Sequence, residues 1–164
     1  MKTEKREILI RYELQKNKSE LPQEDVDLVN SAIKAAEQAY APYSRFRVGA
    51  ALLLENGKII IGSNQENAAY PSGLCAERVA AFSAGSSFPE EKMIKMAIVA
   101  LREGTGTYAV SLCGSCRQVL LEYELKQKYP VKIILSGEND SVVIFNSVKD
   151  LLPMGFSSMQ LNQK

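Results

Sequence analysis

The sequence predicts an α/β fold of three layers, in which helices cover both faces of one mixed sheet of five strands. Two observations support this fold. Short apolar runs typical of strands alternate along the chain with longer segments of helical periodicity. In addition, an Asn-Gly turn at Asn56-Gly57 joins the first two runs, which makes them antiparallel neighbours. We expect a single domain over residues 22–164, preceded by an N-terminal extension over residues 1–21.

The first predicted element is a helix from Pro22 to Ala41. Proline and acidic residues favour a helix start, and apolar residues then recur at helical spacing: Val26, Val29, Ile33, Ala36 and Tyr40. Pro42 should end this helix, because the residue before a proline avoids the helical region. Residues 1–21 are rich in charge and have weak periodicity, so both a strand and a frayed helix fit them.

Two strands and a helix follow. The strands are expected over residues 46–54, where apolar residues alternate from Phe46 to Leu54, and over residues 58–64. A loop over residues 65–74 leads to a helix from Cys75 to about Ser86, which Gly85 should close.

The second half of the chain supplies the remaining elements. Strands are predicted over residues 95–101, 131–135 and 142–145, with a short strand over residues 109–112. A helix from Gly114 to about Gln127 should present Val119, Leu120 and Tyr123 to the core, and a last short helix covers residues 147–151.

Composition excludes several classes of partner. The net charge is +1, which gives no electrostatic basis for binding nucleic acid or a membrane surface. Apolar runs such as residues 50–54 are too short to span a bilayer. Residues 1–11 lack the apolar core of a signal peptide, so we expect a cytoplasmic protein with reduced thiols.

The absence of histidine restricts the chemistry. The sequence contains none, so Ser-His-Asp and Cys-His nucleophilic sites are excluded, as is a zinc site built on imidazole. Any general acid or base must be a carboxylate, a lysine, a tyrosine or a thiol.

The three cysteines predict a metal site. Cys113 and Cys116 have the spacing of two thiolate ligands of one tetrahedral zinc, and Cys75 can be the third ligand if the two helix starts meet. Helix N-termini favour thiolates. Three protein ligands leave a fourth position for water, as in catalytic sites. Arg78 and Arg117, each beside a ligand, can offset the negative charge.

Glu77 would complete a catalytic site. It lies two residues after Cys75, where its carboxylate can take a proton from water and pass it to a substrate, as in hydrolytic attack on an amidine-like carbon with loss of ammonia. Other interpretations of these residues stay open at this point: a redox CxxC pair, buried thiols, a structural zinc site and a solvated glutamate.

Several motifs together resemble the zinc-dependent cytidine deaminases of the short, homotetrameric type. The resemblance covers about residues 26–156, most of the chain. It is carried by the stretches APYSRFRVGAAL at 41–52, NQENA at 64–68, CAER at 75–78, CGSCRQV at 113–119, and Leu151-Leu152-Pro153 with Phe156.

The resemblance implies a set of site residues. Cys75, Cys113 and Cys116 would bind one zinc ion per subunit, Glu77 would transfer protons, and Arg78 would bond to the ligand sulfurs and reduce their charge. Six residues would contact substrate: Phe46 at the pyrimidine ring, Asn64 and Glu66 at the ribose hydroxyls, the backbone of Ala76 at the base, and Tyr70 and Phe156 at the active site of a neighbouring subunit.

The sequence departs from the family pattern at three positions. Leu112 stands where a proline usually precedes the first cysteine of the pair, Ser115 replaces an alanine, and Arg47 replaces a proline after Phe46. None of these changes removes a group that the chemistry needs.

The resemblance implies hydrolytic deamination of cytidine and 2′-deoxycytidine to the uridines with release of ammonia, a step of pyrimidine salvage. The implied assembly is a homotetramer with active sites at subunit interfaces. One alternative is deamination of a related cytosine nucleoside such as blasticidin S, although Asn64 and Glu66 favour an intact ribose. Another is a non-catalytic zinc module, which would normally need a fourth cysteine or histidine ligand that this chain lacks.

Overall fold

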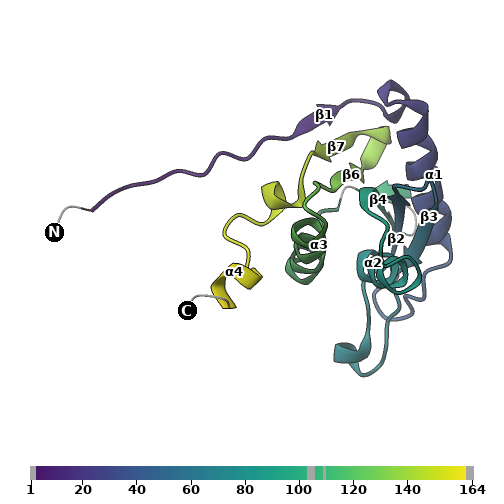
Figure 1. Ribbon diagram of the computed structural model, residues 1–164. Helices are drawn as coiled ribbons and strands as arrows, with labels where there is room; N and C mark the ends of the chain where they lie inside the picture. Colours follow the sequence, from purple (N-terminus) through teal and green to yellow (C-terminus); the bar gives the residue numbers. More distant parts are fainter. Residues whose placement is uncertain (1–2, 103–105, 109, 162–164) are drawn as a thin grey trace.

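The computed structural model of the chain describes residues 3–102, 106–108 and 110–161. A mixed sheet has the strand order β1-β7-β6-β4-β2-β3, and β5 pairs with β4. Helix α1 covers one face of the sheet, and α2 and α3 cover the other (Figure 1). The predicted three-layer α/β/α fold is confirmed, and two short strands, β1 and β5, join the five that were expected.

The centre of the sheet follows the predicted hairpin closely. Strand β2 (Phe46–Leu54) pairs antiparallel with β3 (Ile59–Ser63) on one side and with β4 (Met93–Arg102) on the other. The turn between β2 and β3 is closed by a bond from the Gly57 amide to the Leu54 carbonyl at 3.0 Å. Both faces of β2 are buried from Gly49 onward, because helices pack on each side of it.

The remaining strands extend the sheet from β4. Strand β6 (Lys132–Ser136) runs parallel to β4, and β7 (Val142–Phe145) is antiparallel to β6. The short β5 (Gly106–Tyr108) is antiparallel to β4. The strand predicted over residues 109–112 is wrong for residues 110–112, which form no strand, while residue 109 lies outside the described residues. Residues 110–112 are therefore irregular chain leading into Cys113.

Helix α1 (Gln23–Glu37) forms the core of its face with Leu28, Val29, Ala32 and Ala36 against β2 and β4. The helix ends at Glu37 rather than at Ala41 as predicted. The chain turns away early because the Tyr40 amide bonds to the Asn64 carbonyl at 3.1 Å. This pairing fixes the end of β3 beside the loop that follows α1.

Helices α2 (Ala76–Ser87) and α3 (Gly114–Gln127) build the opposite core with the other face of the sheet. Gly85 does not close α2 as predicted, because the helix continues to Ser87. Gly85 instead gives α3 room: a β-carbon there would lie 2.4 Å from the Tyr123 hydroxyl. Leu120 is fully buried and Tyr123 partly buried, in line with the predicted inner face of α3.

The two ends of the chain add short elements. Within residues 3–21, β1 (Glu13–Gln15) pairs antiparallel with β7, and a 3-10 turn, η1, covers Lys18–Glu20. Near the other end, the helix predicted at 147–151 is a 3-10 helix, η4 (Val148–Leu151), and α4 (Ser158–Leu161) follows. Two further 3-10 turns are η2 (Tyr70–Ser72) and η3 (Glu138–Asp140). Among the described helices, none is long and apolar enough to cross a bilayer.

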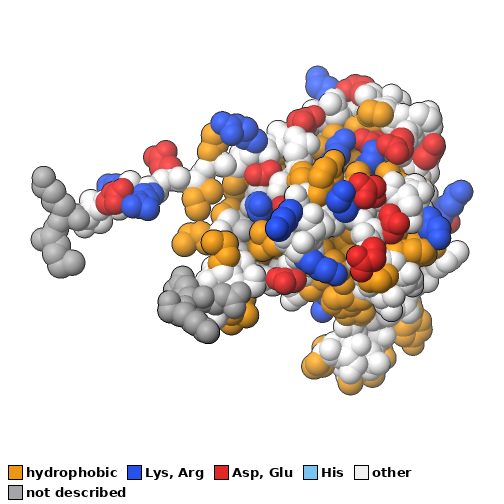
Figure 2. Space-filling view, in the orientation of Figure 1, with side chains coloured by type: hydrophobic (Ala, Val, Ile, Leu, Met, Phe, Trp, Pro, Cys, Tyr) orange, Lys and Arg blue, Asp and Glu red, His pale blue; other side chains and the backbone are white. Residues whose placement is uncertain are grey.

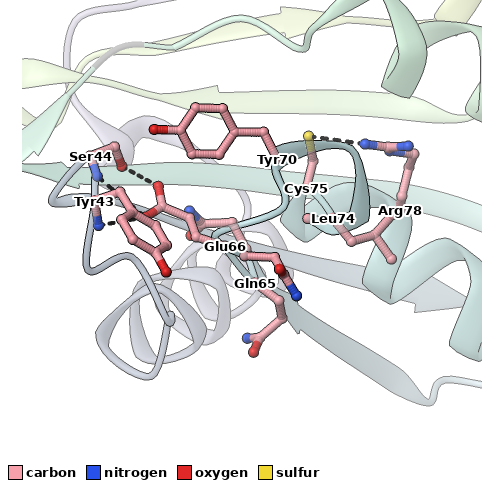
Figure 3. Close-up of a pocket in the computed structure, with 11 residues that line it drawn as sticks. Tyr43, Ser44, Gln65, Glu66, Tyr70, Leu74, Cys75 and Arg78 are labelled. Atoms are coloured by element: carbon pink, nitrogen blue, oxygen red, sulfur yellow. Dashed lines mark hydrogen bonds between the residues drawn. The ribbon is translucent and has the colours of Figure 1, made fainter.

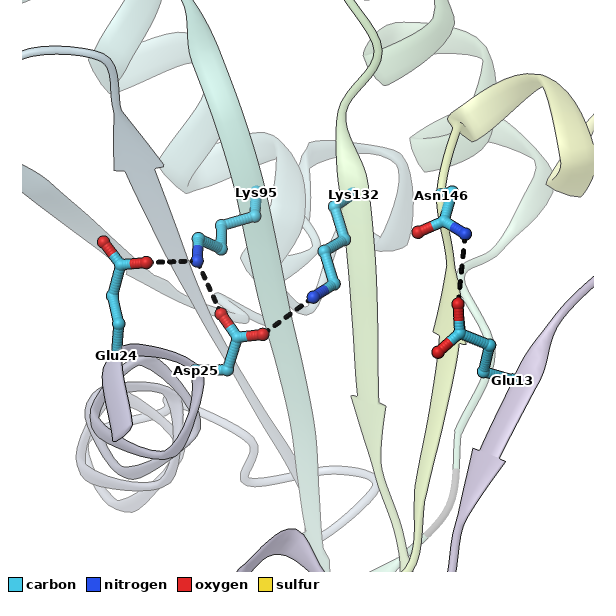
Figure 4. A network of polar contacts seen from close by, with 6 residues as sticks. All are labelled: Glu13, Glu24, Asp25, Lys95, Lys132 and Asn146. Atoms are coloured by element: carbon cyan, nitrogen blue, oxygen red, sulfur yellow. Dashed lines mark hydrogen bonds and ion pairs between the residues drawn. The ribbon is translucent and has the colours of Figure 1, made fainter. Parts of the chain in front are cut away.

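A buried ion network ties the start of α1 to the sheet (Figure 4). The Asp25 carboxylate is 1% exposed and accepts from Lys95 at 2.6 Å and from Lys132 at 2.7 Å. Lys95 also pairs with Glu24. Burial alone would raise the pKa of Asp25, but the two ammonium groups outweigh it and hold the pKa below its usual value near 3.8.

We expect the substitution Asp25→Asn to lower the free energy of unfolding at pH 7 by about 2 kcal/mol, because Lys132 loses its carboxylate and Lys95 keeps only the exposed one of Glu24. A lowered folded-state pKa stabilises the fold above the unfolded-state pKa, and this contribution is lost as pH falls through the folded-state pKa. Urea unfolding from pH 7 to pH 3 should therefore show a wild-type advantage that shrinks below about pH 4. Asp27→Asn, at an exposed carboxylate of the same helix, should show much less effect; an equal effect would contradict the network.

Candidate metal centre and active site

The starts of α2 and α3 bring the three thiols together. Cys75 is the residue that caps α2, and Cys113 caps α3, while Cys116 lies in the first turn of α3. Helix α2 can approach the sheet because Gly62 of β3 has no side chain: a β-carbon there would lie 2.3 Å from the Ala76 carbonyl oxygen. The predicted meeting of the two helix starts is confirmed.

The sulfur positions suit one tetrahedral metal ion. The Sγ atom of Cys113 lies 3.9 Å from that of Cys75 and 3.4 Å from that of Cys116, and all three lie within 4.8 Å of one another. Zinc–sulfur bonds of about 2.3 Å in a tetrahedron place sulfurs about 3.8 Å apart. The three thiols therefore fit a single zinc ion with one further coordination position.

The surroundings of Cys75 favour its thiolate. Hydrogen bonding from Cys116, and also from the Nη2 atom of Arg78 at 3.5 Å, lowers the pKa of Cys75 to about 5. The same contact raises the pKa of Cys116, since a second negative charge beside the first is unfavourable. Cys75 also caps the N-terminus of α2, whose partial positive charge stabilises a thiolate.

Glu77 lies in the first turn of α2, directly beside the sulfurs. The residue is 5% exposed, and the neighbouring Cys75 and Cys116 both affect the pKa of its carboxyl group. Burial raises the pKa of Glu77, and the negative charge of Cys75 raises it further. A buried carboxyl group next to three thiols is uncommon for a merely structural glutamate.

The two arginines beside the ligands have different surroundings. The Arg78 guanidinium bonds to the Cys75 sulfur, while its buried Nε atom has no hydrogen-bond partner among the described residues. Arg117 bonds instead to the Leu112 carbonyl at 2.8 Å, to the Ser111 hydroxyl at 2.8 Å and to the Leu151 carbonyl at 2.9 Å. Arg117 thus holds the chain before Cys113 against η4.

We expect Arg117→Ala to lower the free energy of unfolding by about 2–3 kcal/mol, because three hydrogen bonds to two separate segments are lost. Arg117→Lys keeps the charge but not the planar fork, so it should restore little of this stability. Urea unfolding of both variants provides the measurement. A lysine variant as stable as the wild type would show that Arg117 acts through charge alone.

Leu112 explains how the departure from the family pattern is accommodated. Its side chain is 2% exposed and packs in the α2–α3 core, and its carbonyl accepts from Arg117. A proline at this position would restrict the backbone before Cys113 through its ring. In this chain, the packing of Leu112 and this hydrogen bond hold that backbone instead. Of the other two departures, Ser115 lies at an exposed position of α3, and Arg47 leaves β2 beginning at Phe46 as predicted.

A cavity of about 500 Å³ opens beside Cys75 (Figure 3). Three of the predicted substrate residues line it: Asn64, Glu66 and Tyr70. It is also lined by Tyr43 and Ser44, which sequence reasoning did not single out, and by Arg78. The rings of Tyr43 and Tyr70 meet edge to face with centroids 6.2 Å apart. The only sequence signal for Tyr43 and Ser44 was their place in the stretch 41–52, which carries part of the family resemblance.

The polar residues of the cavity are held by backbone groups. The Asn64 side chain accepts from the Val48 amide at 2.7 Å and donates to the Phe46 carbonyl at 3.0 Å. Glu66 accepts from the Tyr43 amide at 2.9 Å and from the Ser44 hydroxyl. The Ser44 hydroxyl, together with the backbone amides of Tyr43 and Ser44, lowers the pKa of Glu66. Both side chains are therefore preoriented at the rim.

The remaining predicted substrate residues do not line this cavity. Phe46 is half-buried at the start of β2, and Ala76 is fully buried at the start of α2. Phe156 is 56% exposed beyond η4, where Gln118 donates to its carbonyl at 2.8 Å and accepts from its amide at 3.2 Å. These two bonds fix the position of an aromatic side chain that remains exposed in the single subunit.

Comparison with known proteins identifies the family. The family model described as the cytidine and deoxycytidylate deaminase zinc-binding region matches residues 22–131. The chain belongs to this deaminase family. The cytidine deaminase of Sporosarcina psychrophila is 43% identical over 136 residues, covering 82% of this chain and 93% of that protein. That of Halalkalibacterium halodurans is 39% identical over 135 residues, covering 82% and 96%.

A solved structure of this deaminase family has the same fold. The crystal structure of cytidine deaminase from Burkholderia pseudomallei aligns with a TM-score of 0.68 at 37% identity, covering 80% of this chain and 98% of that one. Zinc is the cofactor of the family, and the cysteine group described above could hold one zinc ion.

Proposed function

We propose that this deaminase hydrolyses cytidine and 2′-deoxycytidine to uridine and 2′-deoxyuridine with release of ammonia. The observation that carries the proposal is the buried Glu77 carboxyl group beside three thiols spaced for one zinc ion. A structural zinc site needs no carboxylate there. The curated relatives named cytidine deaminase, which this chain matches over most of their length, support the same substrate.

Each group of the site has a chemical task. Cys75, Cys113 and Cys116 would hold zinc, which supplies Lewis acidity that lowers the pKa of a water molecule. Glu77 would take the proton that water loses on attack at C4 of the cytosine ring and deliver it to the substrate. The C4–N4 bond then breaks, ammonia leaves, and the oxygen of water becomes the new carbonyl oxygen. Arg78, bonded to the Cys75 sulfur, would reduce the charge of the ligand set.

The cavity supplies groups suited to a nucleoside. Asn64 and Glu66 are assigned to the ribose hydroxyls, for which an amide and a carboxylate provide donors and acceptors. Phe46 would pack against the base, and the backbone of Ala76 would hydrogen-bond to it. Tyr70 and Phe156 would border the active site of a neighbouring subunit in a homotetramer; their exposure, 76% and 56%, leaves them available for that contact.

We further propose a domain organisation, a cellular location and a metabolic role for the protein. Residues 22–164 form the deaminase domain and residues 1–21 an extension, which is supported by a family match that starts at residue 22. We place the protein in the cytoplasm, where its three thiols stay reduced. Its role is in pyrimidine salvage, with neither nucleic acid nor membrane as partner.

The test is the ultraviolet absorbance of zinc-quantified protein mixed with cytidine, with ammonia assayed in parallel. We expect conversion to uridine with one ammonia released per uridine formed. Absence of turnover in protein that holds one zinc per chain would overturn cytidine as the substrate, and modified cytosine nucleosides such as blasticidin S would be tested next. Protein that binds no zinc would overturn the metal assignment.

A further inference from the structure

Residues 3–15 form an extended segment that leaves the body of the molecule, here called the N-terminal arm (Figure 1). Its end is β1, the outermost strand of the sheet, which pairs with β7 on one side. Among the described residues, 3–12 belong to no strand. The outer edge of β1 and the arm before it thus offer a template for pairing with a further strand.

The arm has the pattern of a half-buried strand. Apolar residues occupy alternate positions, at Ile8, Ile10, Tyr12 and Leu14, although they are 44–64% exposed. Leu14 lies opposite Val143 of β7, and the Tyr12 ring is 5.7 Å from that of Phe145. The apolar face of the arm therefore continues the α2–α3 side of the sheet, without a cover among the described residues.

On the other face of the arm, Leu9 lies among charged residues of both signs, Glu7, Arg11 and Glu13. Figure 2 shows charges of both signs along the arm. Two identical antiparallel strands related by a two-fold axis normal to their sheet must place one residue opposite its own copy. With Leu9 at the axis, Glu7 faces Arg11 of the second copy and Lys5 faces Glu13 of the second copy. Every pair of charges that meets directly in this register is of opposite sign.

Neighbouring symmetric registers are unfavourable. An axis at Ile8 would place Lys5 opposite Arg11, and an axis at Ile10 would place Glu7 opposite Glu13. Like charges directly opposite one another destabilise a strand pair. In the Leu9 register the other face of the ribbon pairs Ile8 with Ile10 and Arg6 with Tyr12, an apolar contact and a cation–π contact.

We propose that the N-terminal arm pairs with the arm of a second copy of this chain, antiparallel and centred on Leu9, so that two sheets join edge to edge. The pairing buries apolar side chains that are exposed in the single subunit and pairs Lys5, Glu7, Arg11 and Glu13 of each arm with opposite charges. The arm lies before the region matched to the deaminase family, so this contact is additional to the assembly proposed above and independent of the proposed activity.

Cysteine cross-linking tests the register. Directly opposite residues in an antiparallel pair have Cα atoms about 4.5–5.5 Å apart, within disulfide range. Leu9→Cys in the zinc-loaded full chain should form a covalent dimer in air, with the cross-link mapped by mass spectrometry to position 9 of both copies. Arg6→Cys is the matched control, because position 6 faces position 12 and lies about 20 Å from its own copy. It should cross-link no more than the wild type.

Either of two results would overturn the pairing. One is a Leu9→Cys chain that cross-links no more than the wild type. The other is equal cross-linking of the Leu9→Cys and Arg6→Cys chains, which indicates random collision.

Charge reversal provides a second readout. Glu7→Lys places a lysine opposite Arg11 of the second copy at two symmetric positions, so association measured by sedimentation should weaken about tenfold. Arg11→Glu should do the same, and the double variant should recover to within about threefold of the wild type. Single variants that associate like the wild type, or a double variant as weak as either single, would contradict the pairing. Cytidine turnover measured on the same samples tests the proposed function separately.

Discussion

The substitution Glu77→Gln should abolish nearly all turnover of cytidine while leaving zinc and fold in place. Glutamine matches the size of the buried side chain, and Glu77 is not among the three proposed sulfur ligands, so neither packing nor metal binding needs to change. The amide cannot accept and return a proton. A positioned general acid–base group contributes about 10²–10⁴-fold, so kcat should fall by about 10³-fold or more. Steady-state kinetics with zinc quantification provide the measurement.

A matched control keeps this result interpretable. Glu122→Gln makes the same chemical change at an exposed position of α3 and should retain full activity. If Glu77→Gln retained turnover within about tenfold of the wild type, proton transfer by Glu77 would be ruled out. Loss of zinc together with activity would indicate instead that Glu77 supports the metal site.

Cys113→Ser should reduce bound zinc from one per chain to a small fraction and abolish activity with it. A serine hydroxyl is a poor zinc ligand compared with a thiolate, and two remaining sulfurs hold the ion weakly. Cys113 is an exposed residue that caps α3, so the substitution should leave the hydrophobic core intact. Zinc content by atomic absorption after gel filtration provides the measurement.

Two controls bear on the ligand assignment. Ser115→Ala, at an exposed position in the same turn, should keep both zinc and activity. Chelation of the wild type should remove activity, and added zinc should restore it. Full stoichiometric zinc in Cys113→Ser would exclude Cys113 as a ligand.

Most of the order of secondary structure was predictable because local patterns carry it. The alternation from Phe46 to Leu54 and the turn at Asn56-Gly57 predicted β2 and its hairpin with β3, and the structure has both. Such signals depend on residues close together in the chain. The cysteine spacing and the lack of histidine likewise limit the metal chemistry to a site built on thiolates.

Elements set by distant contacts were predicted less well. Helix α1 ends at Glu37, and the Tyr40 amide that follows bonds to the carbonyl of Asn64, a residue far along the chain. Gly85 was expected to close α2, but it lies within the helix, where the lack of a side chain leaves space for Tyr123 of α3. No local pattern records either contact.

The groups available for chemistry follow from the sequence: three thiols, the Glu77 carboxylate and no imidazole. Their arrangement and support depend on how the chain folds. Folding brought Cys75 within 3.9 Å of Cys113, made Arg117 a link between backbone segments rather than a partner of the sulfurs, and turned Glu66 toward the loop at Ser44. The physical reason is that residue types follow from the sequence directly, whereas distances, burial and hydrogen-bond partners depend on segments that meet only when the chain folds.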